Sequence, residues 1–191
     1  MGNFCGDYVK GKLDSEHKKS LPENFLKGVR LHRFIDHFTD TDETVRIIVA
    51  ELRYLYHRAA PVAADICFDH FLAKHYSKFY ATGLRQFVSE FYGKMTLNDH
   101  LIPQEMRPLA YALKENDWLY KYREWETVER TFSSMGRRFS FLKDLDIDNR
   151  PDNSKLEEMK ILFFEFYPRL MEATATFLEE LQVDDGSSSE Y

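Results

Sequence analysis

Cysteine is scarce in this sequence, which has Cys5 and Cys67 as its two thiols and no CxxC pair. A disulfide framework is therefore excluded, and a reducing, cytoplasmic location is favoured. No apolar run approaches the ~18–20 residues that a membrane span requires. The N-terminus also lacks the pattern of a secretory signal peptide. We therefore expect a cytoplasmic protein that does not bind to a membrane.

An excess of positive charge is missing as well. The chain has 26 Lys and Arg against 32 Asp and Glu, so its net charge is −6. Nucleic-acid binding requires a basic field, so we expect no nucleic-acid partner. The GxSxG, Walker A, GxGxxG and HExxH motifs are also absent. Any hydrolysis would then use metal-activated water rather than a covalent enzyme intermediate.

Glycine and proline are few, at eight and six residues, and period-two alternation is weak. Helical periodicity is strong in several segments, and a chain of this length fits one domain. We therefore expect an all-α, single-domain helical bundle over residues 1–182, followed by a disordered tail over 183–191. Helices are expected at 3–10, 24–37, 40–58, 62–76, 84–95, 104–114, 117–137 and 154–181.

Three local signals define helix ends or bends. Asp40 followed by Glu43 resembles a capping box, so a helix is expected to start at Asp40. Pro61 stands where proline favours the first turn of a helix, and the residues after it are apolar nearly all round, as in a buried helix. Pro168 is expected to kink the last helix.

The first candidate site lies at 32–36. His32 and Asp36 are four residues apart, so on a helix they project about 40° apart on one face. Histidine and a carboxylate on one face could form half of a metal site. Arg33 projects about 100° away, and its planar guanidinium suits a phosphate. The alternative is an exposed ion pair near a capped helix end.

The second candidate site lies on the apolar helix. Asp65 and Asp69 share one of its faces, and His70 follows directly. Buried carboxylates need partners, because an unpaired charge in an apolar setting is costly. A metal ion could be that partner, and so could an arginine of a neighbouring helix. Asp7 is a third candidate, because an acid is not needed for packing between its apolar neighbours; an exposed aspartate is the alternative.

Several segments, taken in order, resemble the acyl carrier protein phosphodiesterase family. They are 6–11, 32–36, 39–40, 69–75, 118–123, 135–138 and 166–171. The resemblance implies an all-helical fold related to the HD phosphohydrolases. It also implies cleavage of the phosphodiester that joins 4′-phosphopantetheine to a serine of holo acyl carrier protein, which gives the apo form. The implied cofactor is a divalent cation, Mn²⁺ first and Mg²⁺ as the alternative.

The resemblance also implies roles for individual residues. Catalytic roles would fall to Asp7, Asp69 and His70, with Arg33 as a phosphate contact. Metal binding would involve His32, Asp36, Asp69 and His70, and which of these are direct ligands stays open. Members of the family usually begin with a further segment that bears a histidine. Because this sequence starts after that segment, we expect one helix and one potential ligand to be missing.

The implied partner, acyl carrier protein, is acidic, so a protein of net charge −6 would need a local positive patch to bind it. Candidates for this patch are Lys27, Arg30, Arg137 and Arg138, although solvated surface charges are the alternative. Two other functions stay open at this point. One is an HD-like phosphohydrolase that acts on a nucleotide or another small phosphodiester. The other is a helical protein that binds acyl carrier protein without catalysis.

Overall fold

The computed structural model describes all residues except 14, 16–19, 147–150 and 188–191. Within this part of the chain every regular element is helical, which confirms the predicted all-α, single-domain class. No helix among these residues is both long enough and apolar enough to cross a bilayer. The predicted tail at 183–191 lies partly outside the described residues.

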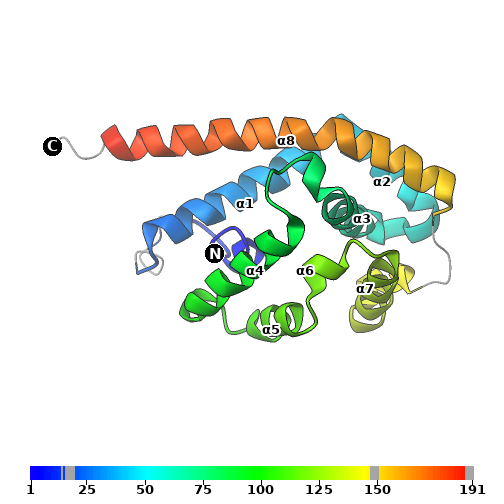
Figure 1. Ribbon diagram of the computed structural model, residues 1–191, viewed down its shortest axis with the longest axis horizontal. Coiled ribbons are helices and arrows are strands. Elements are labelled where there is room, and N and C mark those ends of the chain that lie inside the picture. The colour runs from blue at the N-terminus through cyan, green and yellow to red at the C-terminus, as the bar shows by residue number, and fades with distance from the viewer. Residues whose placement is uncertain (14, 16–19, 147–150, 188–191) are drawn as a thin grey trace.

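Eight α-helices follow one another along the described chain, with short 3₁₀ turns between some of them (Figure 1). The α-helices are α1 (Glu23–Thr41), α2 (Glu43–Tyr56), α3 (Ala60–Lys74), α4 (Leu84–Leu97), α5 (Arg107–Glu115), α6 (Trp118–Lys121), α7 (Trp125–Arg138) and α8 (Asn153–Ser187). The 3₁₀ turns are η1 (Gly6–Tyr8), η3 (His57–Ala59), η4 (Tyr76–Lys78), η5 (Asp99–Leu101) and η6 (Ser140–Leu145).

Helix α3 is the central element of the larger apolar core. Pro61 lies in its first turn, as predicted, and the helix packs against α2, α7 and α8. The ring of Phe68 lies 5.4 Å from that of Phe163 and 5.7 Å from that of Phe166, both on α8. Each such side chain contributes about 1.5–3 kcal/mol when fully buried. The apolar residues that the sequence places around this helix therefore pack against neighbouring helices on more than one side of it.

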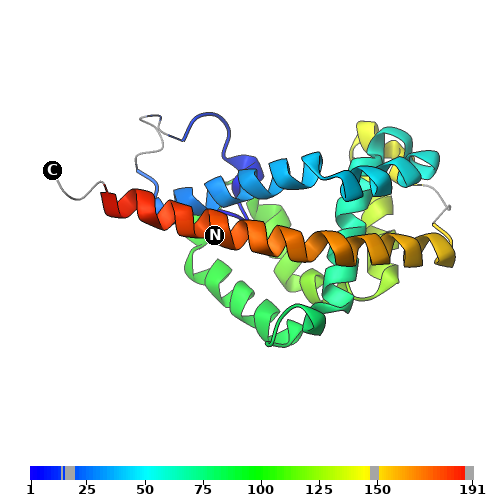
Figure 2. The same cartoon turned by 90° about the horizontal axis from the view of Figure 1, so that it is seen from above.

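The long helix α8 runs beside α1 and α2 along the whole molecule (Figures 1 and 2). It continues through Pro168 without a break and ends at Ser187, further along than predicted. A smaller apolar cluster joins the N-terminal segment and α1 to α4 and α5. Its buried members include Cys5, Val29 and Val88.

The junction of α1 and α2 corrects one prediction. Helix α1 continues through Asp40 to Thr41, and the cap of α2 is Asp42. The Asp42 carboxylate accepts hydrogen bonds from the main-chain nitrogens of Thr44, at 2.8 Å, and Val45, at 3.3 Å. The prediction that Asp40 caps this helix was wrong, because the backbone becomes extended only at Asp42 (φ −70°, ψ 132°).

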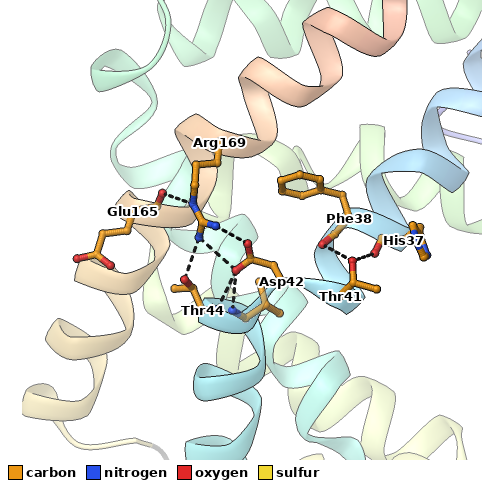
Figure 3. Close-up of polar contacts among 8 residues, drawn as sticks. His37, Phe38, Thr41, Asp42, Thr44, Glu165 and Arg169 are labelled. Atoms are coloured by element: carbon orange, nitrogen blue, oxygen red, sulfur yellow. Dashed lines mark hydrogen bonds and ion pairs between the residues drawn. The ribbon is translucent and has the colours of Figure 1, made fainter.

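Arg169 of α8 fastens this junction (Figure 3). Its Nη1 donates to Asp42 Oδ2 at 2.7 Å, and its Nη2 donates to Asp42 Oδ1 at 3.2 Å and to Thr44 Oγ1 at 2.8 Å. The Asp42 side chain is only 6% exposed. This two-pronged contact fixes α8 along its axis relative to α1 and α2.

The predicted helix at 117–137 is two helices, α6 and α7, with a bend at 122–124. Asp117 before α6 has a left-handed backbone (φ 54°), and the carbonyl of Tyr122 in the bend accepts a hydrogen bond from His70 Nδ1 at 2.7 Å. The predicted helix at 3–10 is the single 3₁₀ turn η1. Tertiary contacts override the local helical pattern in both segments.

Candidate metal centre and the adjoining cavity

Three side chains from η1 and α1 meet at one point. His32 Nε2 lies 3.3 Å from Asp7 Oδ1 and 3.2 Å from Asp36 Oδ2. One ligand atom from each of the three residues lies within 4.8 Å of the other two. His32 is 18% exposed in its side chain, whereas Asp7 and Asp36 are 78% and 52% exposed. This metal cluster of Asp7, His32 and Asp36 therefore has an open side.

Close packing at glycine brings η1 to α1. A Cβ at Gly6 would lie 2.0 Å from His32 Cδ2, so only glycine lets the turn approach the imidazole this closely. At Gly28, one helical turn before His32 on α1, a Cβ would lie 2.7 Å from the main-chain nitrogen of Asn3. The position of Asp7 thus depends on glycines at both ends of the contact.

Arg33 holds the other side of η1. Its Nη2 donates to the carbonyl oxygen of Val9 at 2.9 Å and to that of Gly11 at 2.8 Å. Gly11 has φ 76°, a conformation that favours glycine, and it turns the chain back toward the arginine. The guanidinium predicted to contact phosphate therefore binds main-chain carbonyls and positions the segment that carries Asp7.

A cavity of about 420 Å³ adjoins the metal cluster. Its lining comes from η1, α1, α3 and α8 and is partly acidic and partly apolar. The acidic residues are Asp7, Asp36, Asp40, Asp65 and Asp69, and the apolar residues include Ile35, Phe68, Leu72, Phe163, Phe166 and Leu170. Asp65 and Asp69 are open to solvent through this cavity rather than sealed in the core. We call it the acidic cavity.

The carboxyls of the acidic cavity repel one another. Burial, followed by the charges of Asp40, Asp36 and Asp7, raises the pKa of Asp65 to about 6. Burial, followed by the charge of Asp65, raises the pKa of Asp69 to about 7. Burial also raises the pKa of Asp36, against the opposing effect of His32. Protein surrounds these groups closely enough to weaken their hydration, even though solvent reaches them.

The donor set of the metal cluster fits a divalent cation. Two carboxylates and one imidazole suit Mn²⁺, and carboxylate oxygens also suit Mg²⁺. A cation held there would offset the mutual repulsion that raises the pKa values of the neighbouring aspartates. The residues that could hold it directly are Asp7, His32 and Asp36, because their ligand atoms already converge.

Asp69 and His70 line two different cavities. Asp69 lines the acidic cavity, whereas His70 lines a second cavity together with Trp125. His70 is 3% exposed, and burial lowers the pKa of its imidazole. Its Nδ1 contacts the carbonyl oxygen of Tyr122 at 2.7 Å. The structure therefore brings Asp69, but not His70, to the same cavity as Asp7 and Asp36.

Asp40 is a residue of the cavity that sequence reasoning missed, because it was explained as a helix cap. The signal was present in the spacing. Asp36 and Asp40 are four residues apart on α1, as Asp65 and Asp69 are on α3, and all four carboxylates line one cavity. Two pairs of acids at i, i+4, one of them on a helix that is otherwise apolar nearly all round, indicate a shared polar site.

Comparison with known proteins assigns the chain to a family. The model of the family described as acyl carrier protein phosphodiesterase matches residues 1–170. The chain belongs to the acyl carrier protein phosphodiesterase family. The curated members it resembles include one from Escherichia coli O6:H1, 29% identical over 90% of this chain and 87% of the relative. Another, from Photorhabdus laumondii, is 27% identical over 90% and 85% of the two chains. No solved structure matches the chain.

The structure does not gather the four candidate partner-binding residues on one surface. Lys27 and Arg30 lie in the first half of α1, whereas Arg137 and Arg138 end α7, toward the opposite end of the long axis (Figures 1 and 2). Arg30 pairs with Glu23 at 2.7 Å, and Arg137 pairs with Asp146 at 3.6 Å. Any docking role would belong to one pair or the other.

Proposed function

We propose that this protein is a divalent-metal-dependent hydrolase that cleaves the phosphodiester between 4′-phosphopantetheine and the serine of holo acyl carrier protein. One observation carries the proposal. In a chain of the acyl carrier protein phosphodiesterase family, convergent ligand atoms of Asp7, His32 and Asp36 adjoin a cavity lined by both acidic and apolar side chains. Relatives named acyl carrier protein phosphodiesterase support the choice of substrate.

The charge of the cavity supports the need for a cation. A phosphodiester is an anion, and five aspartates line the space it would enter. Like charges in a partly desolvated site repel strongly. A divalent cation on Asp7, His32 and Asp36, of which Mn²⁺ is the first candidate, supplies positive charge that stabilises the negative charge gathering on the phosphoryl oxygens.

Two carboxyls of α3 can move the protons. Hydrolysis adds water to phosphorus, breaks the bond from phosphorus to the serine oxygen, and leaves a proton on that oxygen. Asp65, with a pKa of about 6, is mostly ionised at neutral pH and can accept the proton that water loses. Asp69 has the higher pKa of the two, about 7 in the metal-free protein, so it is the better candidate to carry a proton and supply it to the serine oxygen.

The apolar lining of the cavity suits the 4′-phosphopantetheine arm of the substrate, whereas acyl carrier protein itself would stay outside the cavity. Its apolar lining comes from Phe68 and Leu72 of α3 and from Phe163, Phe166 and Leu170 of α8. An uncharged, flexible chain such as pantetheine can bury its methylenes and methyl groups there. The acidic surface of acyl carrier protein would then be met by a basic pair outside the cavity. Lys27 and Arg30 are the better candidates, since they share α1 with His32 and Asp36.

The deciding experiment is a panel assay on metal-stripped protein. Holo acyl carrier protein, a cyclic nucleotide and a simple aryl phosphodiester are each incubated without metal and with Mn²⁺ or Mg²⁺. Mass spectrometry should show loss of the arm from holo acyl carrier protein only with metal, and Asp36→Asn should abolish it. Faster turnover of the nucleotide would favour the general phosphohydrolase. Metal-independent binding of acyl carrier protein with no turnover of any substrate would favour the non-catalytic protein.

A further inference from the structure

Helix α3 separates two cavities that share no lining residue. Asp65 and Asp69 face the acidic cavity, while His70 and Lys74 face a second cavity of about 380 Å³. The start of α7 contributes Trp125 to it, and one face of the first turns of α8 completes it. Its volume falls in the range of small-molecule sites, which begins near 300 Å³. The proposed phosphodiesterase reaction uses none of these residues.

Lysine gives the second cavity its positive charge. Lys74 and Lys160 both line it, and Glu157, which forms an ion pair with Lys160, is its one acid. Burial, followed by the charges of Lys160, Lys78 and Lys74, lowers the pKa of His75. Burial also lowers the pKa of His70. Both histidines are therefore neutral at physiological pH, and the two lysines leave a net positive charge.

His70 adds a fixed hydrogen-bond acceptor. A carbonyl can only accept, so the 2.7 Å contact with Tyr122 requires the proton on His70 Nδ1. In the neutral ring Nε2 then carries a lone pair. The Trp125 ring stands edge-on to His70, with centroids 5.3 Å apart. Phe71 and Leu156 supply further apolar lining.

We propose that the second cavity binds a small organic anion. The anionic group is held by Lys74 and Lys160, and the apolar part of the ligand packs against Trp125 and Leu156. Charge-assisted contacts to two lysines and one apolar wall are the usual composition of such a site, in which a few polar groups orient a ligand held by apolar contact. Glu157 opposes anion binding and tempers the affinity.

The two tryptophans of the chain make a test with an internal control. Trp125 lines the second cavity and its indole Nε1–H donates to Glu129 at 3.0 Å, whereas Trp118 begins α6 and is not part of the lining. Phenyl phosphate, which joins an anion to an apolar ring, is titrated into ¹⁵N-labelled protein without added divalent cation. The Trp125 indole resonance should shift saturably at millimolar concentrations or below, and that of Trp118 should not. Benzyl alcohol, which lacks the charge, should bind about tenfold more weakly.

Variants of opposite charge sharpen the test. Lys160→Met and Lys74→Met should each weaken phenyl phosphate binding about tenfold, because each removes one charge-assisted contact. Glu157→Gln should strengthen it. Lys94→Met, at the end of α4 and outside the cavity, should change nothing. Circular dichroism of each variant checks that it is folded.

Three results would overturn the proposal. The first is no saturable shift of the Trp125 indole by 10 mM phenyl phosphate, a concentration well above the millimolar affinity of the weakest specific sites. The second is equal shifts of both indoles. The third is weaker binding by Glu157→Gln together with no effect of the lysine variants. None of these results bears on arm removal, so this site and the proposed function can fail independently.

Discussion

His32 and His70 are both histidines on well-formed helices, and each has an aspartate within four residues of it in the sequence. The molecule nevertheless places them in different chemical surroundings. His32 is 18% exposed and contacts two carboxylates. His70 is 3% exposed and contacts a main-chain carbonyl and the edge of a tryptophan. The first arrangement suits a cation, and the second suits a neutral ring that accepts a hydrogen bond.

The difference teaches that proximity in sequence is a weak guide to a shared site. Asp36 reaches His32 because a spacing of four residues keeps both on one face of α1. Asp69 and His70 are neighbours in sequence, but they project about 100° apart around α3 and line different cavities. Four predictions can break or sharpen this comparison, beginning with the largest expected effect.

Exchanging each histidine for glutamine tests the comparison directly. His32→Gln should lower arm removal at least ~100-fold, because it removes an imidazole from the metal cluster. Its Tm should change by only about 2 °C, since partly exposed ion pairs contribute little to stability. His70→Gln should do the reverse: it should destabilise the fold by about 1–3 kcal/mol and keep most of the activity.

Both quantities come from one preparation of each variant, by a mass-spectrometric assay and a thermal melt. A His70→Gln protein with an unchanged melting curve and no activity would show that the second histidine acts in catalysis after all.

Arg33→Met tests whether η1 must be held for the metal cluster to form. Without the contacts to Val9 and Gly11, Asp7 should lose its fixed position beside His32. Mn²⁺ affinity, measured by calorimetry, should fall about 10–100-fold, as is usual when a residue that supports a ligand is removed. Arg30→Met is the matched control, because Arg30 pairs with Glu23 on the same helix. If Arg33 were a phosphate contact, Mn²⁺ affinity would be unaffected and only the Michaelis constant would rise.

Arg169→Met tests how much the contact between α8 and the junction of α1 and α2 contributes to stability. Removing the guanidinium leaves Asp42, which is 6% exposed, without its ion-pair partner. The free energy of unfolding should fall by about 1–3 kcal/mol in urea titrations. Asp42→Ala should cost more, because it also removes the cap of α2. Arg46→Met, an exposed arginine on α2, should stay within about 0.5 kcal/mol of the wild type. Equal effects of the three substitutions would show that the contact in Figure 3 contributes nothing specific.

The pH dependence of stability provides the smallest effect. The folded-state pKa values of Asp65 and Asp69, about 6 and about 7, lie above those of unfolded aspartate. The folded state therefore holds more protons, and stability from these groups falls as pH rises from about 4 through about 7. Asp69→Asn should flatten this fall and raise Tm at pH 8 by about 2–4 °C. Melts of metal-free protein across this pH range measure it, and an Asn variant that melts lower than the wild type at pH 8 would contradict it.

Much of the fold follows from local sequence signals. Periodic apolar residues located most helices, and Pro61 marked the start of α3. The junctions were less predictable. Asp40 and Asp42 are both plausible caps, and the choice of Asp42 coincides with its contact to Arg169, more than a hundred residues away. Likewise, the bend between α6 and α7 lies where His70 contacts a carbonyl.

The sequence by itself determined which acids and histidines share a helix face, because the angle between two residues around a helix depends only on their spacing. It thereby indicated Asp36 with His32 and Asp65 with Asp69. Only the tertiary structure decided which face meets which. It brought Asp7 to His32 through the close contact at Gly6, opened Asp69 and Asp40 to one cavity, and turned His70 to another. The physical reason is that helix packing depends on the shapes of side chains far apart in sequence, which the periodicity of any one helix does not contain.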